Sequence, residues 1–272
     1  MVRMRWLAGS ELPYRPAARA VAAGNALRVY LSLVALAALC LLTSSAIVVG
    51  GLFQPPGRRQ LFARGLISRM FRTHLALMHR VGAVRLDLTE LDALRDAPAM
   101  VIAPNHPSMA DAALILSRVP DLTCVMKAEI LDNILFGSGA RMAGYITNDP
   151  PRAMLRAAVD NLRAGHHLLL FPEGTRTRRL PVNELQRTVA VIARRAGVPV
   201  QAVHIETSTA FLCKGWPLWR VPATPMVYRV RLGRRFDPPS DVDAFTAQLQ
   251  EYFRQELAGA RLPTLPLDAD SR

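Results

Sequence analysis

Two short apolar runs, each followed by a polar motif, most constrain how this 272-residue chain can fold. Residues 99–103 (AMVIA) precede the first motif, residues 105–111 (NHPSMAD), and residues 167–171 (HLLLF) precede the second, residues 172–177 (PEGTRT). Short apolar runs bounded by turn residues are typical of buried strands. The ligand crevice of an open α/β sheet forms beyond the carboxyl ends of its strands, so we expect both motifs to face one site.

The remaining segments alternate between strand-like and helix-like patterns. Apolar or alternating runs predict strands at residues 84–89, 122–126, 145–147, 198–205 and 226–232. Helical spacing predicts helices at residues 112–118, 151–164, 185–196 and 243–258, with a loop or broken helix at 131–144. Strands that alternate with helices are typical of an α/β fold, so we predict a mixed, largely parallel sheet flanked by helices.

A stretch without charged residues, Val29 to Phe53, precedes this α/β domain. It is long enough to cross a hydrocarbon core of about 30 Å as a helix. A secretory signal peptide would have a shorter apolar region and an obvious cleavage site, so we expect a retained N-terminal helical membrane anchor. Arginines flank both ends, so the positive-inside rule does not orient it. Crossing the bilayer and dipping into it both remain open.

A second helix is predicted at residues 61–81, with apolar residues on one face and arginines largely elsewhere. Such a helix lies in the headgroup layer or packs on the catalytic core, and its closeness to the anchor favours the membrane. The expected organisation is a basic N-terminal arm at 1–26, a membrane-anchoring segment at 27–81 with helices at 29–53 and 61–81, a catalytic domain at 82–262, and a C-terminal tail at 263–272.

The formal net charge of +13, carried almost entirely by arginines, predicts an anionic partner, either nucleic acid or a bilayer surface. Aromatic residues make up 6% of the chain, and no stacking platform for single-stranded nucleic acid is visible. We therefore expect a lipid bilayer and no nucleic acid. Cys40, Cys124 and Cys213 lie far apart without metal-ligand spacing, which indicates free thiols in a reducing compartment and a catalytic domain on the cytoplasmic face.

The first motif can supply a general base. The ordinary pKa of histidine, about 6.5, suits proton abstraction near neutral pH. Positions five apart do not share a helix face, so His106 and Asp111 can meet only through a turn at Pro107 and Ser108. Asp111 would then hold one ring nitrogen and leave the other free. Ser108 is a possible nucleophile, but it is also a good helix N-cap, and we favour the cap.

The second motif places a carboxylate, a glycine and an arginine directly after a strand. Gly174 permits close approach of a substrate, or a backbone shape that other residues resist. Arg176 offers a planar donor fork for phosphate or a carbonyl. Glu173 can bind acceptor hydroxyls or pair with Arg176, and a plain turn with a surface ion pair is the simpler alternative. Neither motif fits the glycine-rich nucleotide loop, and no metal-ligand cluster is present.

Taken together, the two motifs resemble the glycerolipid acyltransferase family of the 1-acylglycerol-3-phosphate acyltransferase type. The resemblance covers about residues 60–235, and the segments 127–129 and 197–200 also match. It implies a membrane-bound O-acyltransferase that moves a fatty acyl group from an acyl thioester, on coenzyme A or acyl carrier protein, to the hydroxyl of a lysolipid. It implies that His106 deprotonates this hydroxyl, that Asp111 orients His106, and that the alkoxide attacks the thioester carbonyl directly.

The same resemblance implies the binding residues. Lys127 and Arg176 match positions associated with the acceptor phosphate, and Glu173, Gly174 and Thr175 match acceptor-binding positions. It implies no metal ion and no cofactor besides the acyl-CoA or acyl-ACP co-substrate. Residues 82–262 would then be the acyltransferase domain.

Two departures from the family pattern concern the acceptor. Asn148 stands where the family usually has an arginine, and residues 178–183 (RRLPVN) lack the usual Phe-Lys-x-Gly stretch. We therefore keep two readings of the acceptor open, lysophosphatidate and another lysolipid such as one that contains an amino acid. A Ser108-dependent lipid hydrolase is a second alternative, and a catalytically silent membrane or nucleic-acid binding protein is a third.

Overall fold

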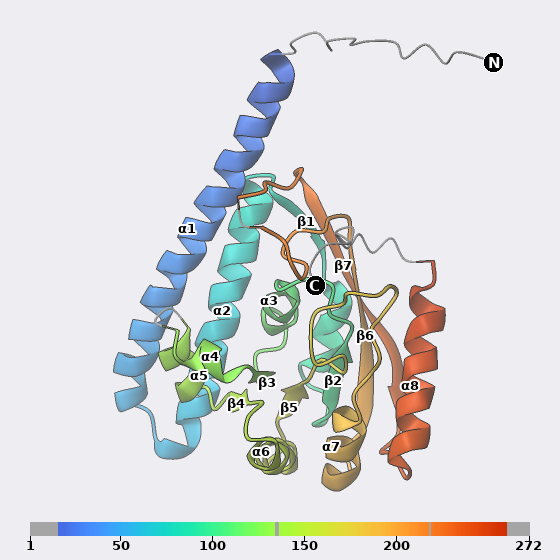
Figure 1. Cartoon of the computed structure of the whole chain (residues 1–272). Helices are drawn as coiled ribbons and strands as arrows, with labels where there is room; N and C mark the ends of the chain where they lie inside the picture. The colour runs from blue at the N-terminus through green and yellow to red at the C-terminus, as the bar shows by residue number, and fades with distance from the viewer. Residues whose placement is uncertain (1–15, 134–135, 218, 260–272) are drawn as a thin grey trace, which may run out of the picture.

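The computed structural model describes residues 16–133, 136–217 and 219–259 (Figure 1). Within these residues one sheet has the strand order β1-β7-β6-β2-β5-β3-β4. The strands are β1 (Val84–Asp87), β2 (Val101–Pro104), β3 (Leu122–Met126), β4 (Ile146–Thr147), β5 (His167–Leu169), β6 (Val200–Thr207) and β7 (Met226–Phe236). Strands β6, β2, β5, β3 and β4 run parallel, whereas β7 is antiparallel to β6 and β1 is parallel to β7. The predicted mixed, largely parallel sheet is confirmed.

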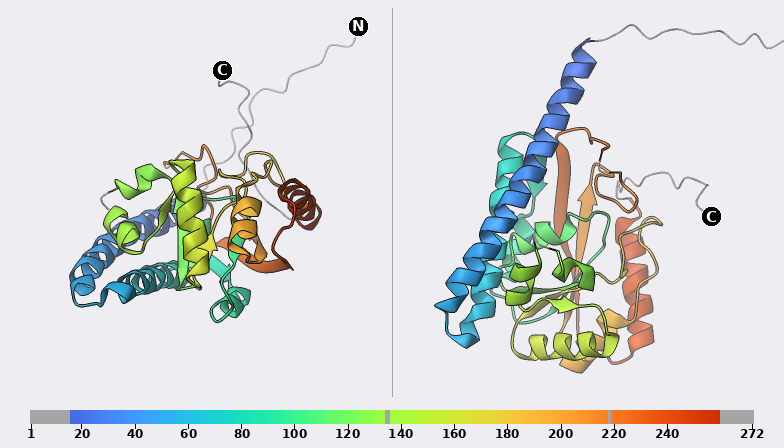
Figure 2. Two further views of the ribbon diagram at one scale, coloured as in Figure 1. Left: turned by 90° about the horizontal axis from the view of Figure 1, so that it is seen from below. Right: turned by 60° about the vertical axis from the view of Figure 1, so that its left-hand side comes forward.

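Helices cover both faces of this sheet (Figure 2). The helices are α1 (Pro16–Leu52), α2 (Arg59–Arg80), α3 (Asp111–Leu116), α4 (Ala128–Leu131), α5 (Gly137–Met142), α6 (Pro151–Arg163), α7 (Thr188–Ala196) and α8 (Val242–Leu257), with 3-10 turns at Pro56–Arg58 and Thr89–Leu94. Alternate residues of each strand enter different cores, as strand geometry requires. Ile102 packs with residues of α1, α2, α3 and α5, whereas Val101 and Ala103 pack with α6, α7 and α8.

The apolar N-terminal helix begins earlier than the sequence pattern predicted. Helix α1 starts at Pro16 rather than near Val29, and it is about 55 Å long at 1.5 Å per residue. Residues 16–26 are rich in alanine, the best helix former, and proline is favoured at the first helical position. The prediction that residues 16–26 belong to a basic arm outside the helix is therefore wrong. Residues 1–15 and the expected tail at 263–272 lie outside the described residues.

One face of α1 packs on the protein and the other is exposed. Val29, Cys40 and Ile47 are buried against the core that α2 and α5 also enter. The exposed large apolar side chains of this helix are Val21, Leu27, Tyr30, Leu31, Val34, Leu41, Leu42, Val48, Val49 and Leu52. The span Val21–Leu52 is long and apolar enough to cross a membrane by length and composition.

The second predicted helix, α2, packs its apolar face on the protein. Ile67, Met70 and Leu75 are buried, and Ile67 and Leu75 belong to the same core as β2. The preference for a headgroup-layer position is therefore wrong for this face, because the sheet and α3 cover it. The proposed boundary at residue 82 does not separate two cores, since α1, α2 and the sheet share one.

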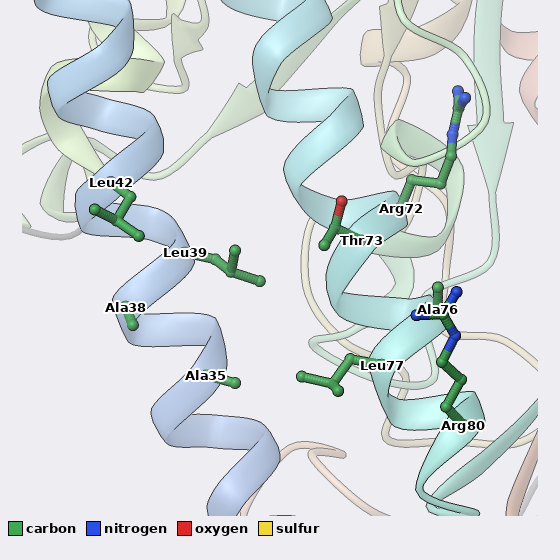
Figure 3. Close-up of a pocket in the computed structure, with 9 residues that line it drawn as sticks. All are labelled: Ala35, Ala38, Leu39, Leu42, Arg72, Thr73, Ala76, Leu77 and Arg80. Carbon is green, nitrogen blue, oxygen red and sulfur yellow. The ribbon is translucent and has the colours of Figure 1, made fainter.

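A shallow groove of about 560 Å³ runs between α1 and α2 (Figure 3). Its lining residues are Ala35, Ala38, Leu39, Leu42, Arg72, Thr73, Ala76, Leu77 and Arg80. Leu39 and Leu77 point into the gap between the helices, whereas Arg72 extends away from α1 and Arg80 lies along α2 near Ala76 (Figure 3). The groove is therefore apolar along its length, which matches the exposed face of α1.

Arg64 joins α2 to the edge of the sheet, although its spacing suggested an outward position. Its side chain is 2% exposed. The guanidinium donates to Ala143 O at 2.9 Å, to Asp121 Oδ1 at 2.9 Å and to Asn161 Oδ1 at 3.2 Å. These partners lie after α5, before β3 and on α6, so one side chain connects four segments. A buried charge of this kind is stable only when its donors are satisfied.

Replacing Arg64 is expected to destabilise the protein strongly. Arg64→Ala leaves two oxygen acceptors and a carboxylate without their donor, and losing one partner of a buried pair costs about 3 kcal/mol. Thermal unfolding of the purified protein in detergent measures the effect. Arg69→Ala, an exposed arginine on the same helix, is the control and is expected to change stability by less than about 0.5 kcal/mol. Equal melting temperatures for both variants would contradict the role of Arg64.

Candidate active site

The two polar motifs leave neighbouring parallel strands. Val101 and Ile102 of β2 pair with Leu168 and Leu169 of β5, so both strands end at the same edge of the sheet. Beyond that edge the Thr177 N–H donates to the His106 carbonyl at 2.7 Å. The expectation that the motifs face one another is confirmed at the level of the backbone.

Asn105 fixes the start of the first motif. Its side-chain amide donates to Ile205 O at 3.0 Å, and its Oδ1 accepts from the Ile205 N–H at 2.7 Å. Asn105 is 1% exposed and binds the backbone of β6 as another strand residue would. Sequence reasoning did not assign this residue, although an amide side chain directly after a buried strand was a visible signal. It determines where the next residue, His106, leaves the sheet.

His106 and Asp111 form the predicted pair. His106 Nδ1 lies 2.9 Å from Asp111 Oδ2, and the Ser108 N–H donates to the same oxygen at 2.8 Å. A backbone N–H can only donate, so Oδ2 acts as an acceptor, and we assign the imidazole proton to Nδ1. The second ring nitrogen, Nε2, then carries a lone pair. The Asp111 side chain is fully buried, and that of His106 is 17% exposed.

Phe171 holds the imidazole from the side of β5. The two ring centroids are 3.8 Å apart and the rings are inclined by 19°, which is a stacked arrangement. Asp111 restrains the ring through Nδ1, and Phe171 restrains its plane. Both contacts act on a part of His106 other than Nε2. The ring is therefore oriented before any substrate binds.

The Asp111 carboxylate is costly to keep in this position. Burial raises the pKa of Asp111 above its ordinary value, and the hydrogen bonds from His106 and Ser108 and the charge of Arg176 oppose the rise. Its other oxygen, Oδ1, has no hydrogen-bond partner among the described residues. Carboxylates with a perturbed pKa cluster at functional sites, and this one is bonded to the partly exposed imidazole of His106.

Glu173 faces inward and binds protein groups, and its expected role in acceptor binding stays a prediction. Its Oε1 accepts from the His106 N–H at 2.8 Å and from Thr177 Oγ1 at 2.7 Å. Its Oε2 accepts from the Asn183 N–H at 2.9 Å. Burial raises the pKa of Glu173, and these three hydrogen bonds oppose the rise. Glu173 is 3% exposed, so its contacts favour a positioning residue that connects the two motifs.

Ser108 closes the turn between His106 and Asp111. Its hydroxyl donates to Phe211 O at 3.0 Å and accepts from the Ala110 N–H at 3.2 Å. The N-cap of α3 is Ala110, so the predicted cap is wrong by two residues, although the hydroxyl does satisfy a backbone donor before the helix. Ser108 is 1% exposed.

The second motif turns at Gly174 and reaches the β6–β7 loop through Arg176. Gly174 has φ +66°, and a Cβ there would lie 2.3 Å from Gln186 Nε2, so the position requires glycine. Arg176 Nη1 donates to Leu212 O at 2.8 Å and to Cys213 O at 3.0 Å. The expected alternative of a Glu173–Arg176 pair is not formed, because each side chain has other partners.

Four cationic side chains gather beside this turn. Lys214 Nζ donates to Thr175 Oγ1 at 2.7 Å. Partial burial and the like charges of Arg178, Lys127 and Arg176 lower the pKa of Lys214. Lys127 directly follows β3, so it extends from the same edge of the sheet as the two motifs. The cluster can bind an anionic group near His106.

Sequence reasoning missed Lys214. The residue lies 37 positions beyond the second motif, and nothing in its spacing links it to the site. The one available signal was that Lys127 and Lys214 are the only lysines among 34 basic residues. Among the described residues no group of three or more histidine, cysteine, aspartate or glutamate side chains is placed to hold a metal ion.

Comparisons with known proteins match this chain to acyltransferases. The model of the Acyltransferase family matches residues 85–206, which include both motifs and strands β2, β3, β4 and β5. The chain is 31% identical over 180 residues to a lyso-ornithine lipid O-acyltransferase from Rhodobacter capsulatus, a match that covers 58% of this chain and 62% of the relative. It is 33% identical over 110 residues to a lyso-ornithine lipid O-acyltransferase from Pseudomonas aeruginosa, covering 39% of this chain and 42% of the relative. The chain thus spans less than two thirds of the curated relatives that it matches.

A solved structure shares the fold. The crystal structure of the 1-acyl-sn-glycerophosphate acyltransferase PlsC from Thermotoga maritima superposes with a TM-score of 0.63 at 18% sequence identity. The match covers 85% of this chain and 96% of that one. It therefore includes helical segments outside the 85–206 region as well as the sheet.

Proposed function

We propose that the chain is a member of the acyltransferase family and that it transfers a fatty acyl group from an acyl thioester to the hydroxyl of a lysolipid. The observation that carries the proposal is the His106–Asp111 pair, 2.9 Å apart and open to solvent only through the histidine ring. The acyl donor is an acyl-CoA or an acyl carrier protein thioester, and the four cations beside the second motif suit the phosphate of either carrier.

The mechanism is direct transfer with one general base. His106 Nε2 takes the proton from the lysolipid hydroxyl, and the resulting alkoxide oxygen attacks the thioester carbonyl carbon. The tetrahedral intermediate collapses with cleavage of the carbon–sulfur bond, and the departing thiolate receives the proton from the imidazolium. Asp111 stabilises that imidazolium through Nδ1. Glu173 and Phe171 keep the backbone and the ring of His106 in place throughout.

The position of Ser108 supports direct transfer over a hydrolase with a serine nucleophile. A serine nucleophile needs a base within hydrogen-bond reach to accept its proton. The Ser108 hydroxyl instead donates to the Phe211 carbonyl. His106 Nδ1, the ring nitrogen on the side of the turn, is taken by Asp111. Ser108 therefore serves the shape of the turn.

An amino-acid lysolipid is the acceptor that we propose. Both curated relatives carry the name of lyso-ornithine lipid O-acyltransferases. Asn148 is exposed at the end of β4, and its N–H donates to Met126 O at 2.9 Å, directly before Lys127. An uncharged side chain at this position removes one cation next to Lys127. A head group with one carboxylate and its own amine needs fewer cations than a doubly charged phosphate.

Helix α1 is proposed to lie along one leaflet of the bilayer instead of crossing it. Near its start Thr224 Oγ1 donates to Asn25 Oδ1 at 2.6 Å, and near its end Ile47 is completely buried in the main core. A helix fixed to the catalytic body over that length cannot cross the hydrocarbon core unless the sheet follows it. Its exposed apolar face fits the interface between headgroups and acyl chains. We propose that this leaflet is the cytoplasmic one, because Cys40, Cys124 and Cys213 are free thiols, as expected in a reducing compartment.

Removal of the base is expected to abolish most turnover. His106→Ala should lower kcat/KM for acyl transfer about 10³-fold, the usual contribution of a positioned base, and Asp111→Asn should lower it by a smaller factor. Ser108→Ala is the control for the hydrolase and should lower it less than about tenfold. Product formation from a labelled acyl thioester measures all three. Full activity of His106→Ala would contradict the mechanism, and a trapped acyl-enzyme that disappears in Ser108→Ala would favour the hydrolase.

The acceptor is tested with one labelled acyl thioester and a panel of lysolipids. Lyso-ornithine lipid should be acylated at least about tenfold faster than lysophosphatidate, since one well-placed charged contact is worth about 1.4 kcal/mol or more. Asn148→Arg, which restores a cation beside Lys127, should narrow this preference several-fold. Comparable turnover of every lysolipid offered would contradict the proposed acceptor and leave the chemistry at His106 standing. Parallel assays with acyl-CoA and acyl-ACP identify the donor.

A further inference from the structure

The described residues of the β6–β7 loop, 208–217 and 219–225, contact both active-site motifs. The carbonyl oxygens of Leu212 and Cys213 hold Arg176, and the carbonyl oxygen of Phe211 accepts from the Ser108 hydroxyl. The Met109 N–H donates to Leu212 O at 3.0 Å. Both polar motifs therefore depend on the position of this loop.

The far end of the same loop rests on α1. Tyr30 Oη donates to the Trp219 carbonyl at 3.4 Å, and Arg28 Nη1 donates to Thr224 Oγ1 at 3.4 Å. Thr224 Oγ1 in turn donates to Asn25 Oδ1 at 2.6 Å. The loop is the orange segment that reaches the upper half of α1 in Figure 1 and in the right-hand view of Figure 2. It thus joins the active site to the apolar helix.

Trp219 leaves most of its side chain in solvent at this junction. It is 81% exposed, whereas large aromatic side chains are usually well buried. Tyr30, which binds its carbonyl, has Leu27, Leu31 and Val34 within about one helical turn, and these are 61%, 59% and 67% exposed. The exposed indole therefore belongs to a residue whose backbone contacts the helix that carries this exposed apolar face. Tryptophan is enriched at the level where a bilayer meets water.

Two further features suit a bilayer surface. The Arg220 guanidinium lies 5.0 Å from the centre of the Trp216 ring, and Trp216 Nε1 donates to Arg220 O at 3.1 Å, so the tip of the loop is internally braced. Arg220, next to Trp219 in the chain, and Arg28, which binds Thr224 of the same loop, are both exposed and positively charged. An anionic headgroup layer complements this charge, and the acyl boundary beneath it complements the indole.

We propose that the β6–β7 loop is a second bilayer-docking element, in which Trp219 enters the boundary between headgroups and acyl chains beside the outer face of α1. The inference rests on the proposed contact of α1 with one leaflet. The same loop holds Arg176 and Ser108, so its docking places the opening above His106 at the bilayer surface. A lysolipid then reaches the base without leaving the membrane. Met109 of the first motif is 57% exposed and donates its N–H to Leu212 O of this loop.

A single-tryptophan protein tests the docking directly. The chain has three tryptophans, Trp6, Trp216 and Trp219, so Trp6→Phe with Trp216→Phe leaves Trp219 as the only reporter. Added vesicles of phosphatidylcholine and phosphatidylglycerol should shift its emission to shorter wavelength. Lipids brominated near the headgroup end of the chain should quench it more than lipids brominated near the chain terminus.

A tryptophan on the opposite face is the matched control. In the protein without its own tryptophans, Gln248→Trp puts the reporter at an exposed position of α8, across the sheet from α1, and vesicles should leave its emission unchanged. Unchanged emission of Trp219 while the protein floats with the vesicles would overturn the proposal and point to a soluble partner for this patch. The readout needs no catalysis, so failure of the acyltransferase proposal would not affect it.

Kinetics give a second, independent test. Trp219→Glu should lower kcat/KM for a lysolipid embedded in vesicles about tenfold and leave the rate with a short-chain lysolipid in solution within twofold. Trp219→Phe keeps an apolar ring and should retain most of the rate on vesicles. Equal losses on both substrates in Trp219→Glu would show a structural role of the loop and contradict docking.

Discussion

The buried hydrogen bond between Asp111 and His106 is the interaction on which the arrangement of the site depends. A carboxylate with no exposure is destabilising on its own, and burial raises its pKa. The hydrogen bonds from the imidazole Nδ1 and the Ser108 N–H offset that cost, and the charge of Arg176 adds to them. The turn from Pro107 to Ala110 must therefore adopt one shape, and that shape leaves Nε2 as the ring atom able to accept a proton. The hydrogen bonds to the Asp111 carboxylate therefore determine which nitrogen of His106 can act as the base.

The surrounding fold keeps this small unit in register. Asn105 binds the backbone of β6 directly before His106, and Glu173 of the second motif accepts from the His106 N–H. The carbonyl oxygens of the β6–β7 loop accept hydrogen bonds from Arg176. The apolar helix α1 is part of the same construction, because it enters the core with β2 and supports the β6–β7 loop at its other end. The proposed membrane-contacting helix and the catalytic residues thus belong to one packed structure, which fits the proposal of a lipid acceptor held at a surface.

Local sequence patterns predicted the strands that carry the active-site residues, but they did not predict contacts between residues far apart in the chain. Short apolar runs indicated β2 and β5, and the rule for strand ends placed His106 opposite the second motif. The pattern could not show that Arg64 is buried, because periodicity does not reveal partners 57 and 97 residues away. For the same reason the hydrogen bond from the His106 N–H to Glu173 was not predicted, and Lys214 was missed. The start of α1 was missed because the four arginines of residues 1–26 were given more weight than the alanines of residues 16–26.

The tautomer of His106 is the property that tests the account most directly. Nitrogen-15 NMR of protein labelled at its six histidines, with His106→Gln to assign the signal, reports which ring nitrogen carries the proton. The account predicts that neutral His106 is protonated at Nδ1, with a bare Nε2 facing the opening, and that Asp111→Asn disturbs this preference. A neutral His106 protonated at Nε2 would have no lone pair on the nitrogen that faces the acceptor hydroxyl, and this result would contradict the proposed mechanism.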